Sequence, residues 1–202
     1  MKKKNVFITG QKSDFDKCLA EIFVREGYNT IIADKNDPTG IIDFIDIYID
    51  VSDDRNSADS FSIRDGLDEA VIRSVYEVNV LESMKMLETF LPSLDNGCGK
   101  RLCFLTAAEA SINETHDISG YAYKMSKAAI HNFYQMISNK LSPAGYTFRI
   151  FDPMYGIIDA KASAEGAFNY FTRRRGIEQN NPLRDDETRL VFRDATGREH
   201  AW

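Results

Sequence analysis

Short apolar runs alternate along the chain with longer stretches in which apolar residues recur every three or four positions. The first run, residues 6–10, reads Val-Phe-Ile-Thr-Gly, which predicts a buried strand that ends at a glycine. Residues 14–26 then show helical spacing, which predicts a helix capped by Ser13 or Asp14 and stopped by Gly27. A strand followed directly by a helix is the repeating unit of an α/β fold.

The same alternation continues to the end of the chain. Further strands are predicted at residues 30–33, 45–51, 101–107, 146–151 and 188–193, and further helices at residues 65–94, 121–141 and 164–174. Residues 45–51 alternate apolar and acidic positions, but their acidic residues also share one helical face, so both states stay open there. Pro92 is expected to end the helix 65–94. The whole pattern predicts one domain, residues 1–202, with a doubly wound parallel sheet.

Ligands of such a sheet bind in a crevice at the carboxyl ends of its strands. In this chain, that edge is predicted to collect Asp34 and the segments 10–16, 50–54, 107–112 and 152–157. Candidate functional residues are therefore sought in these segments and in the helices that follow them.

Composition and charge exclude several classes of function. The chain has 202 residues, 43% of them hydrophobic, and a net charge of -6. An acidic chain does not fit a general partner of nucleic acid or of anionic membranes, because such partners require a basic face. Three widely spaced cysteines and three scattered histidines show neither a disulfide framework nor a metal-binding pattern, so no metal site is predicted and a reducing cytoplasm is expected. No apolar window approaches the length of a membrane span.

One motif gives a specific resemblance. Residues 123–129 read Tyr-Lys-Met-Ser-Lys-Ala-Ala and open a predicted helix after a strand. Upstream, residues 76–80 read Tyr-Glu-Val-Asn-Val, and a Thr-Gly pair ends the first strand. These segments, together with the ending Gly-Arg-Glu-His-Ala-Trp at residues 197–202, resemble the short-chain dehydrogenase/reductase family. The resemblance covers nearly the whole chain and implies a Rossmann-like fold.

The resemblance also implies a set of roles. Tyr123 would be the general acid/base towards a small carbonyl or alcohol, and Lys127 would lower its pKa and hold the nicotinamide ribose. Asn79 would hold a water for proton relay. Gly10 would border the pyrophosphate of NAD or NADP, and Asp34 would accept hydrogen bonds from the adenine ribose and favour NAD. The family commonly forms dimers through its helices, so a homo-oligomer is expected.

The chain departs from the family in the residues that surround the cofactor. Asp14 and Asp16 stand where the glycine-rich loop has glycines, and residues 50–53 read Asp-Val-Ser-Asp in place of Asn-Asn-Ala-Gly. A carboxylate about 5 Å from a phosphate charge costs roughly 3 kcal/mol at an effective dielectric constant near 20. Ala107 stands at the position of the catalytic serine, with Ser111 as a possible substitute.

A further departure is a deletion. Only about ten residues join the second strand to Ile45, which is too few for a crossover helix and a third strand. A sheet of six strands in the family order 2-1-4-5-6-7 is therefore predicted, without the unit that usually flanks the adenosine.

Two functions from different classes remain open. The first is an atypical NAD(P)-dependent oxidoreductase that uses Tyr123, Lys127 and Asn79 on a substrate that the sequence does not identify. The second is a cofactor-free pseudoenzyme that serves as a binding or regulatory protein, in which Tyr123 and Lys127 are inherited but unused and Asn79 is a helix-bending or capping amide. Asp34 also fits a plain turn, and Asp50, Asp53 and Asp54 fit a cation site only if their oxygens converge.

Overall fold

A single parallel sheet forms the centre of the molecule. The computed structural model describes residues 3–10, 13–33, 42–59, 64, 66–114, 119–173 and 186–202. The strands are β1 (Asn5–Ile8), β2 (Asn29–Ile32), β3 (Ile47–Asp50), β4 (Arg101–Leu105), β5 (Thr147–Asp152) and β6 (Phe192–Asp194). They run in the order β2-β1-β3-β4-β5-β6, and every pair is parallel. The predicted fold and strand order are confirmed.

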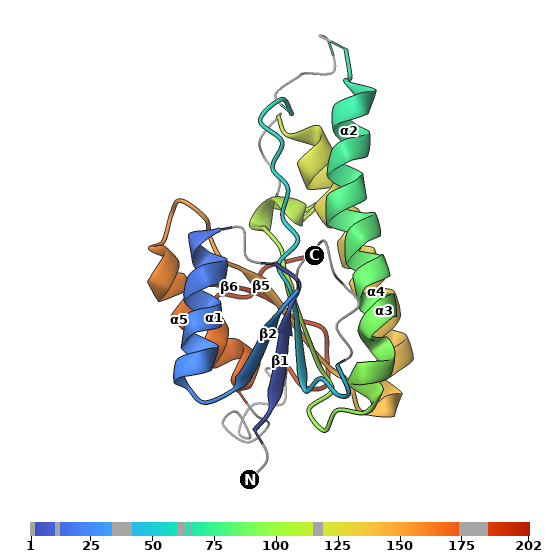
Figure 1. The fold of residues 1–202 in the computed structure, drawn as a ribbon. Coiled ribbons are helices and arrows are strands. Elements are labelled where there is room, and N and C mark those ends of the chain that lie inside the picture. Colours follow the sequence, from blue (N-terminus) through green and yellow to red (C-terminus); the bar gives the residue numbers. More distant parts are fainter. Residues whose placement is uncertain are drawn as a thin grey trace.

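Helices cover both faces of the sheet (Figure 1). The helices are α1 (Asp14–Arg25), α2 (Glu69–Tyr76), α3 (Ser83–Asp95), α4 (Tyr121–Leu141) and α5 (Ala160–Thr172). Helices α1 and α5 pack together on one face, α3 and α4 lie on the other, and α2 extends beyond the sheet and packs against α4 (Figure 1). A π-helical segment, η1 (Glu77–Glu82), joins α2 to α3, and short 3-10 turns, η2 (Ala108–Ala110) and η3 (Ser142–Ala144), flank α4.

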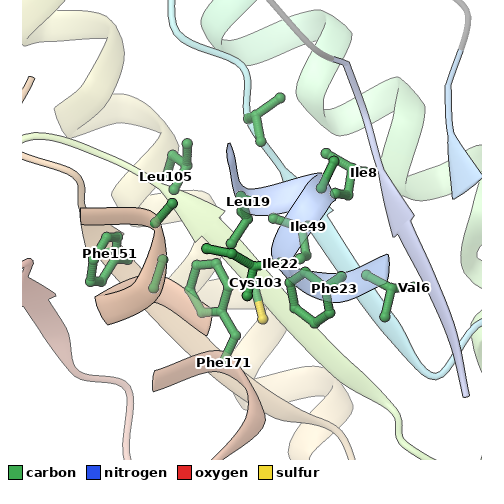
Figure 2. Packing of buried hydrophobic residues seen from close by; sticks show 14 of the residues in the cluster. Val6, Ile8, Leu19, Ile22, Phe23, Ile49, Cys103, Leu105, Phe151 and Phe171 are labelled. Atoms are coloured by element: carbon green, nitrogen blue, oxygen red, sulfur yellow. The ribbon is translucent and has the colours of Figure 1, made fainter. Parts of the chain in front are cut away.

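The two faces of the sheet bury two separate apolar clusters. Val6, Ile8 and Ile49 point towards α1 and α5, where Figure 2 shows them packed with Leu19, Phe23 and Phe171. The alternate residues Phe7, Tyr48 and Phe104 point to the opposite face and pack against α3 and α4. Because a parallel sheet is covered on both sides, its strands read as continuous apolar runs. This explains why the sequence predicted them well.

Two elements resolve alternatives that the sequence left open. Ser13 is the N-cap of α1, since its hydroxyl accepts from the N–H of Asp16 (3.1 Å) while the Asp16 carboxylate accepts from the N–H of Ser13 (2.8 Å). Within the stretch 45–51, residues 47–50 form strand β3, which pairs with both β1 and β4 and is buried throughout. The helical alternative for this stretch was wrong.

Other boundaries differ from the prediction. The helix predicted at 65–94 begins at Glu69, after the cap Asp68, and Pro92 lies inside α3 without ending it. Pro92 removes one N–H from the last turns, and α3 continues to Asp95 because its apolar face stays packed on the sheet.

The last two elements are also displaced from the predicted ranges. Helix α5 starts at Ala160, earlier than the predicted residue 164, because the Asp159 carboxylate caps the N–H groups of Lys161 and Ala162. Strand β6 is shorter than the predicted range 188–193 and begins at Phe192. Among the described residues, β2 is an edge strand, in agreement with the predicted loss of a third strand. Residues 34–41, which follow β2, lie outside the described part of the chain.

Candidate functional site

The candidate site lies where β1, β3 and β5 end beside the start of α4. A cavity of about 240 Å³ opens at this edge. Its walls are formed by Ser13, Asp16, Val51, Asp53, Arg55 and Tyr155. The predicted crevice at the carboxyl ends of the strands is therefore present, and acidic side chains line part of it.

Helix α4 presents the Tyr and Lys of the motif one turn apart on its buried face. The helix starts after Gly120, whose φ of +70° favours glycine. The carboxylate of Asp59 accepts hydrogen bonds from the N–H groups of Ala122 (3.1 Å) and Tyr123 (2.8 Å). Asp59 thus caps the first turn and fixes the height at which Tyr123 and Lys127 meet the crevice.

The Asp53 carboxylate binds both Tyr123 and Lys127. The Tyr123 hydroxyl donates to Asp53 Oδ1 at 2.7 Å, and Lys127 Nζ lies 2.9 Å from the same oxygen. Lys127 Nζ also donates to the carbonyl of Ser52 at 2.8 Å. Tyr123 is 5% exposed and Lys127 is 1% exposed, so neither group faces open solvent. The side chain that replaces a family glycine is the direct partner of the Tyr and the Lys.

The charges around Asp53 keep it ionised. Burial alone would raise the pKa of Asp53, but attraction by Lys127 and Arg55 outweighs it and lowers that pKa. Burial and the nearby Asp53 charge raise the pKa of Tyr123 well above its ordinary value. Tyr123 is therefore a neutral phenol that donates its proton to a carboxylate. This is the opposite of the lowered tyrosine pKa that the family resemblance implies.

Arg55 completes the arrangement from the solvent side. Its guanidinium carbon lies 4.2 Å from the centre of the Tyr123 ring, and its Nε lies 3.4 Å from Asp53. Its Nη1 lies 3.3 Å from Glu109. The Tyr123 ring is covered by a cation, which adds attraction to a ring that is already buried.

Asn79 lies in the π-helical segment between α2 and α3 and is 1% exposed. Its amide oxygen accepts from the N–H of Asp54 (2.7 Å), and its amide nitrogen donates to the Asp54 carbonyl (3.1 Å) and to Ser126 (3.0 Å). The Asn79 side chain therefore pins the segment that carries Asp53. The Asn79 amide thus holds a non-helical segment and caps no helix among the described residues.

Acidic side chains lie at the start of α1, after β1. Asp16 is 2% exposed, caps the start of α1 with Ser13, and lines the cavity. Asp14 points to solvent and pairs with Lys17 at 3.0 Å. Gly10 lies in the described loop, and a side chain there would meet Val51 at ordinary contact distance, so the site no longer requires glycine at this position.

The position of the family's catalytic serine holds no hydroxyl. Ala107 is fully buried at the end of β4. Ser111 accepts from the N–H of Glu114 at 3.2 Å and closes a turn, so the structure gives it a role in the backbone. The preceding residue, Thr106, is also buried, and its hydroxyl bonds His131.

Two other predicted residues are Asp34 and Asp50. Asp34 lies outside the described residues. Asp50 accepts from Thr9, Ser52 and Ser83 and serves as a buried acceptor. The described residues contain no group of three or more His, Cys, Asp or Glu side chains that could hold a metal ion.

Sequence reasoning missed three residues of this site. It noted Asp53 as an extra acid and as a candidate cation ligand, not as the partner of Tyr123 and Lys127, and it gave no role to Arg55 or Asp59. The available signal was the replacement of a glycine by Asp53, because a new side chain there must enter the crevice. Arg55 and Asp59 belong to no motif, and their partners lie 54 and more than 60 positions away along the chain.

Comparisons with known proteins agree with this fold. No protein-family model matches the sequence. The chain is 29% identical over 87 residues to C-signal of Myxococcus xanthus, a match that spans 43% of this chain and 52% of that protein. The chain thus covers about half the length of the curated relative that it matches.

Solved structures cover much more of the chain. The carbonyl reductase Sniffer of D. melanogaster superimposes with a TM-score of 0.75 at 14% identity, over 100% of both chains. A carbonyl reductase from Pseudomonas aeruginosa PAO1 in complex with NADP gives 0.74 at 12% identity, over 98% of this chain and 100% of that one. An oxidoreductase of the short-chain dehydrogenase/reductase family from Brucella ovis, in complex with a partially ordered NAD, gives 0.67 at 17%, over 85% and 94%. The family resemblance is confirmed at the level of the fold.

A dinucleotide does not fit the residues of this crevice. The Asp53 carboxylate lies on Lys127 and Tyr123, which would have to meet the nicotinamide ribose and the substrate. Buried Asp16 sits at the start of α1, where a pyrophosphate would need N–H groups and a positive field. No helix of the described residues is long and apolar enough to cross a membrane.

Proposed function

We propose that this chain belongs to the short-chain dehydrogenase/reductase family and works as a binding or regulatory protein that does not transfer hydride. The observation that carries the proposal is the Asp53 carboxylate, which is bonded at once to the Tyr123 hydroxyl and the Lys127 ammonium. The two groups that define the family's chemistry therefore already have an internal partner.

Energetics support this assignment. Removing one partner of a buried ion pair costs about 3–5 kcal/mol. A cofactor that needs Lys127 must first displace Asp53 and then accept a nearby carboxylate charge. Such a cost lowers affinity by a factor of roughly 100 or more. The raised pKa of Tyr123 also removes the proton acceptor that alcohol oxidation would require at neutral pH.

A second candidate is an NAD(P)-dependent oxidoreductase. It is favoured by the placement of Tyr123, Lys127 and Asn79 on the elements that the family resemblance implies. It is also favoured by similar folds solved with NAD or NADP. This candidate requires Asp53 to leave the pair, and it names no substrate beyond a small carbonyl or alcohol.

Calorimetric titration with NAD, NADH, NADP and NADPH at two salt concentrations separates the two candidates. We expect neither heat nor thermal shift from the wild-type protein at millimolar cofactor. Micromolar binding of any of the four would overturn the proposal, and loss of turnover in Tyr123→Phe would then establish the second candidate.

A pair of glycine variants identifies the cause of a negative result. Asp53→Gly removes the carboxylate from the crevice, and Asp14→Gly removes an exposed acid nearby. Binding that is gained by Asp53→Gly alone would assign the block to Asp53. The second variant controls for general charge and for glycine in a loop or at a helix start.

We also propose that the protein forms a homodimer through the outer face of η1 and α4. Leu81, Met125 and Met136 are 44%, 49% and 63% exposed on these helices. Large apolar side chains on neighbouring helices are typical of a self-association surface. Sedimentation velocity should give a dimer, and Met136→Glu should shift it to monomer. A wild-type monomer at high micromolar concentration would contradict this proposal.

A further inference from the structure

The segment 198–202 contacts the body of the protein through backbone bonds to β6, the Arg189–Glu199 pair and the His200 side chain. His200 Nδ1 lies 2.6 Å from Glu114 Oε2, and His200 Nε2 lies 2.9 Å from Asp194 Oδ2. The His200 side chain is 6% exposed and its ring stacks on Phe192, with the centroids 5.0 Å apart. The loop 111–114 and strand β6 are thus joined through one imidazole ring.

Both nitrogen atoms of His200 face a carboxylate. A carboxylate accepts hydrogen bonds and donates none when ionised, so both contacts need an N–H. Only the imidazolium form carries two N–H groups, whereas neutral imidazole turns a lone pair towards one of the acids. The geometry therefore fits protonated His200 and opposes the neutral form.

Other residues of the segment 198–202 contact Glu114 or its neighbour Asn113. The N–H of Ala201 donates to Glu114 Oε1 at 3.2 Å, and Arg198 Nη2 lies 3.7 Å from that oxygen. Asn113 donates its side-chain N–H to the Trp202 carbonyl at 2.7 Å. Trp202 itself is held by this one side-chain bond and by ring contacts with His131 and Phe192.

Trp202 forms one wall of a cavity of about 220 Å³ between η2, α4 and the segment 198–202. The other walls are Ala110, Ile112, Ala128, His131, Asn132 and Gln135. The Trp202 ring meets the His131 ring edge-on, with the centroids 5.0 Å apart. Burial lowers the pKa of His131 to about 3, so His131 stays neutral when His200 titrates.

We propose that residues 198–202 form a pH-sensitive latch, in which protonated His200 holds Trp202 against this cavity and loss of the proton releases it. The latch is built from residues outside the Asp53 centre, so it stands or falls independently of the proposed function.

The direction of the switch follows from the surrounding charges. Burial alone would lower the pKa of His200, but its hydrogen bonds to Glu114 and Asp194 outweigh burial and raise that pKa. Glu114 and Asp194 both have lowered pKa values, and Arg198 faces Glu114. The latch is therefore closed at and below pH 6.5, the ordinary pKa of histidine, and opens as the pH rises through the raised value.

Trp202 is the only tryptophan of the chain, so its fluorescence reports the latch directly. Emission and acrylamide quenching of the full chain should be followed from pH 6 to pH 9. We expect a red shift and a rise in quenching of roughly two- to threefold, because Trp202 is 36% exposed when the latch is closed.

Two variants and one control make the test specific. His200→Gln should show the open signal at every pH, and Glu114→Gln should lower the midpoint of the transition. Glu69→Gln, which removes an exposed acid of α2 paired with Arg73, should leave the transition unchanged. A wild-type signal that does not change with pH, or an unchanged transition in His200→Gln with native circular dichroism, would overturn the latch.

Discussion

At the scale of single residues, the chemistry of the crevice depends on which group balances the charge of the Lys127 ammonium. An ammonium that is 1% exposed needs an anionic or carbonyl partner, because isolated buried charge is very costly. Here Asp53 and the Ser52 carbonyl fill that need from within the chain. The same carboxylate raises the pKa of Tyr123, so the one side chain of Asp53 acts on both Tyr123 and Lys127.

Asp53→Asn should therefore destabilise the fold. The variant leaves Lys127 buried without a counter-charge, and we expect a loss of about 3 kcal/mol in the free energy of unfolding. Adding Lys127→Met should recover part of that loss, because the unpaired charge is removed. Urea unfolding of the two single variants and the double variant measures this coupling.

The exposed acid Asp14 gives the matched control. Its pair with Lys17 is solvent-exposed, so Asp14→Asn should change the free energy of unfolding by less than about 0.5 kcal/mol. If the losses in the free energy of unfolding from Asp53→Asn and Lys127→Met simply add in the double variant, Asp53 and Lys127 do not interact.

Asp59 acts on the backbone of α4. Its carboxylate bonds the N–H groups of Ala122 and Tyr123, so Asp59→Ala should cost about 1 kcal/mol, as for other helix caps. Asp59→Asn retains an acceptor oxygen and should lose less. Thermal unfolding of the two variants tests this order, and equal losses would argue against a capping role.

The sequence predicted Tyr123 and Lys127 of this centre but not their contact with Asp53. Tyr123 and Lys127 lie four positions apart, and helical periodicity alone places them on one face. Their partner Asp53 comes from a different strand end, 70 positions before Tyr123. No local pattern records such a contact, so only the missing glycine could point to it.

At the scale of elements, the π-helical segment η1 is the most informative deviation from the predicted pattern. Periodicity predicted one continuous helix over 65–94, but the structure interrupts it at residues 77–82. Segments of this kind are frequent at functional sites. Here η1 carries the Asn79 amide that meets the backbone of Asp54.

Asn79→Ala should detach the segment that carries Asp53. The N–H and the carbonyl of Asp54 would lose their partner, which we expect to cost about 2 kcal/mol. Asn79→Asp keeps an acceptor for the N–H and should be less disruptive to it. Hydrogen exchange of the Asp54 amide should rise first in Asn79→Ala, and an unchanged rate would contradict the pinning role.

Boundaries of elements were harder to predict than their existence. Strands buried on both faces were found from their apolar runs, and α4 was predicted with its observed limits. Pro92 was expected to end a helix because the local rule ignores packing. The apolar face of α3 stays buried through Leu94, and this burial outweighs one missing hydrogen bond.

At the scale of the whole molecule, the stability of this acidic protein depends on carboxylates that pair with cationic groups or accept hydrogen bonds. Asp53, Glu114, Asp186, Asp194 and Glu199 all have lowered pKa values, because cationic partners or hydrogen bonds outweigh any effect of burial. Asp152 shifts the other way through burial. A group whose folded pKa lies below its unfolded value stabilises the fold above that value, and this contribution disappears as the pH falls.

The protein should therefore be labile in acid. We expect the urea midpoint to fall as the pH is lowered from about 5 towards 3, where these carboxylates take up protons and the arginine and lysine partners lose their counter-charges. Asp186 is the sharpest single test, because it is 3% exposed and bonds both Arg193 and Arg173. Asp186→Asn should lower the midpoint at pH 7 and flatten its dependence on pH. A wild-type midpoint that stays constant between about pH 6 and pH 3.5 would show that these pairs do not stabilise the fold, and the ionised Asp53 in the crevice would then lose its thermodynamic support.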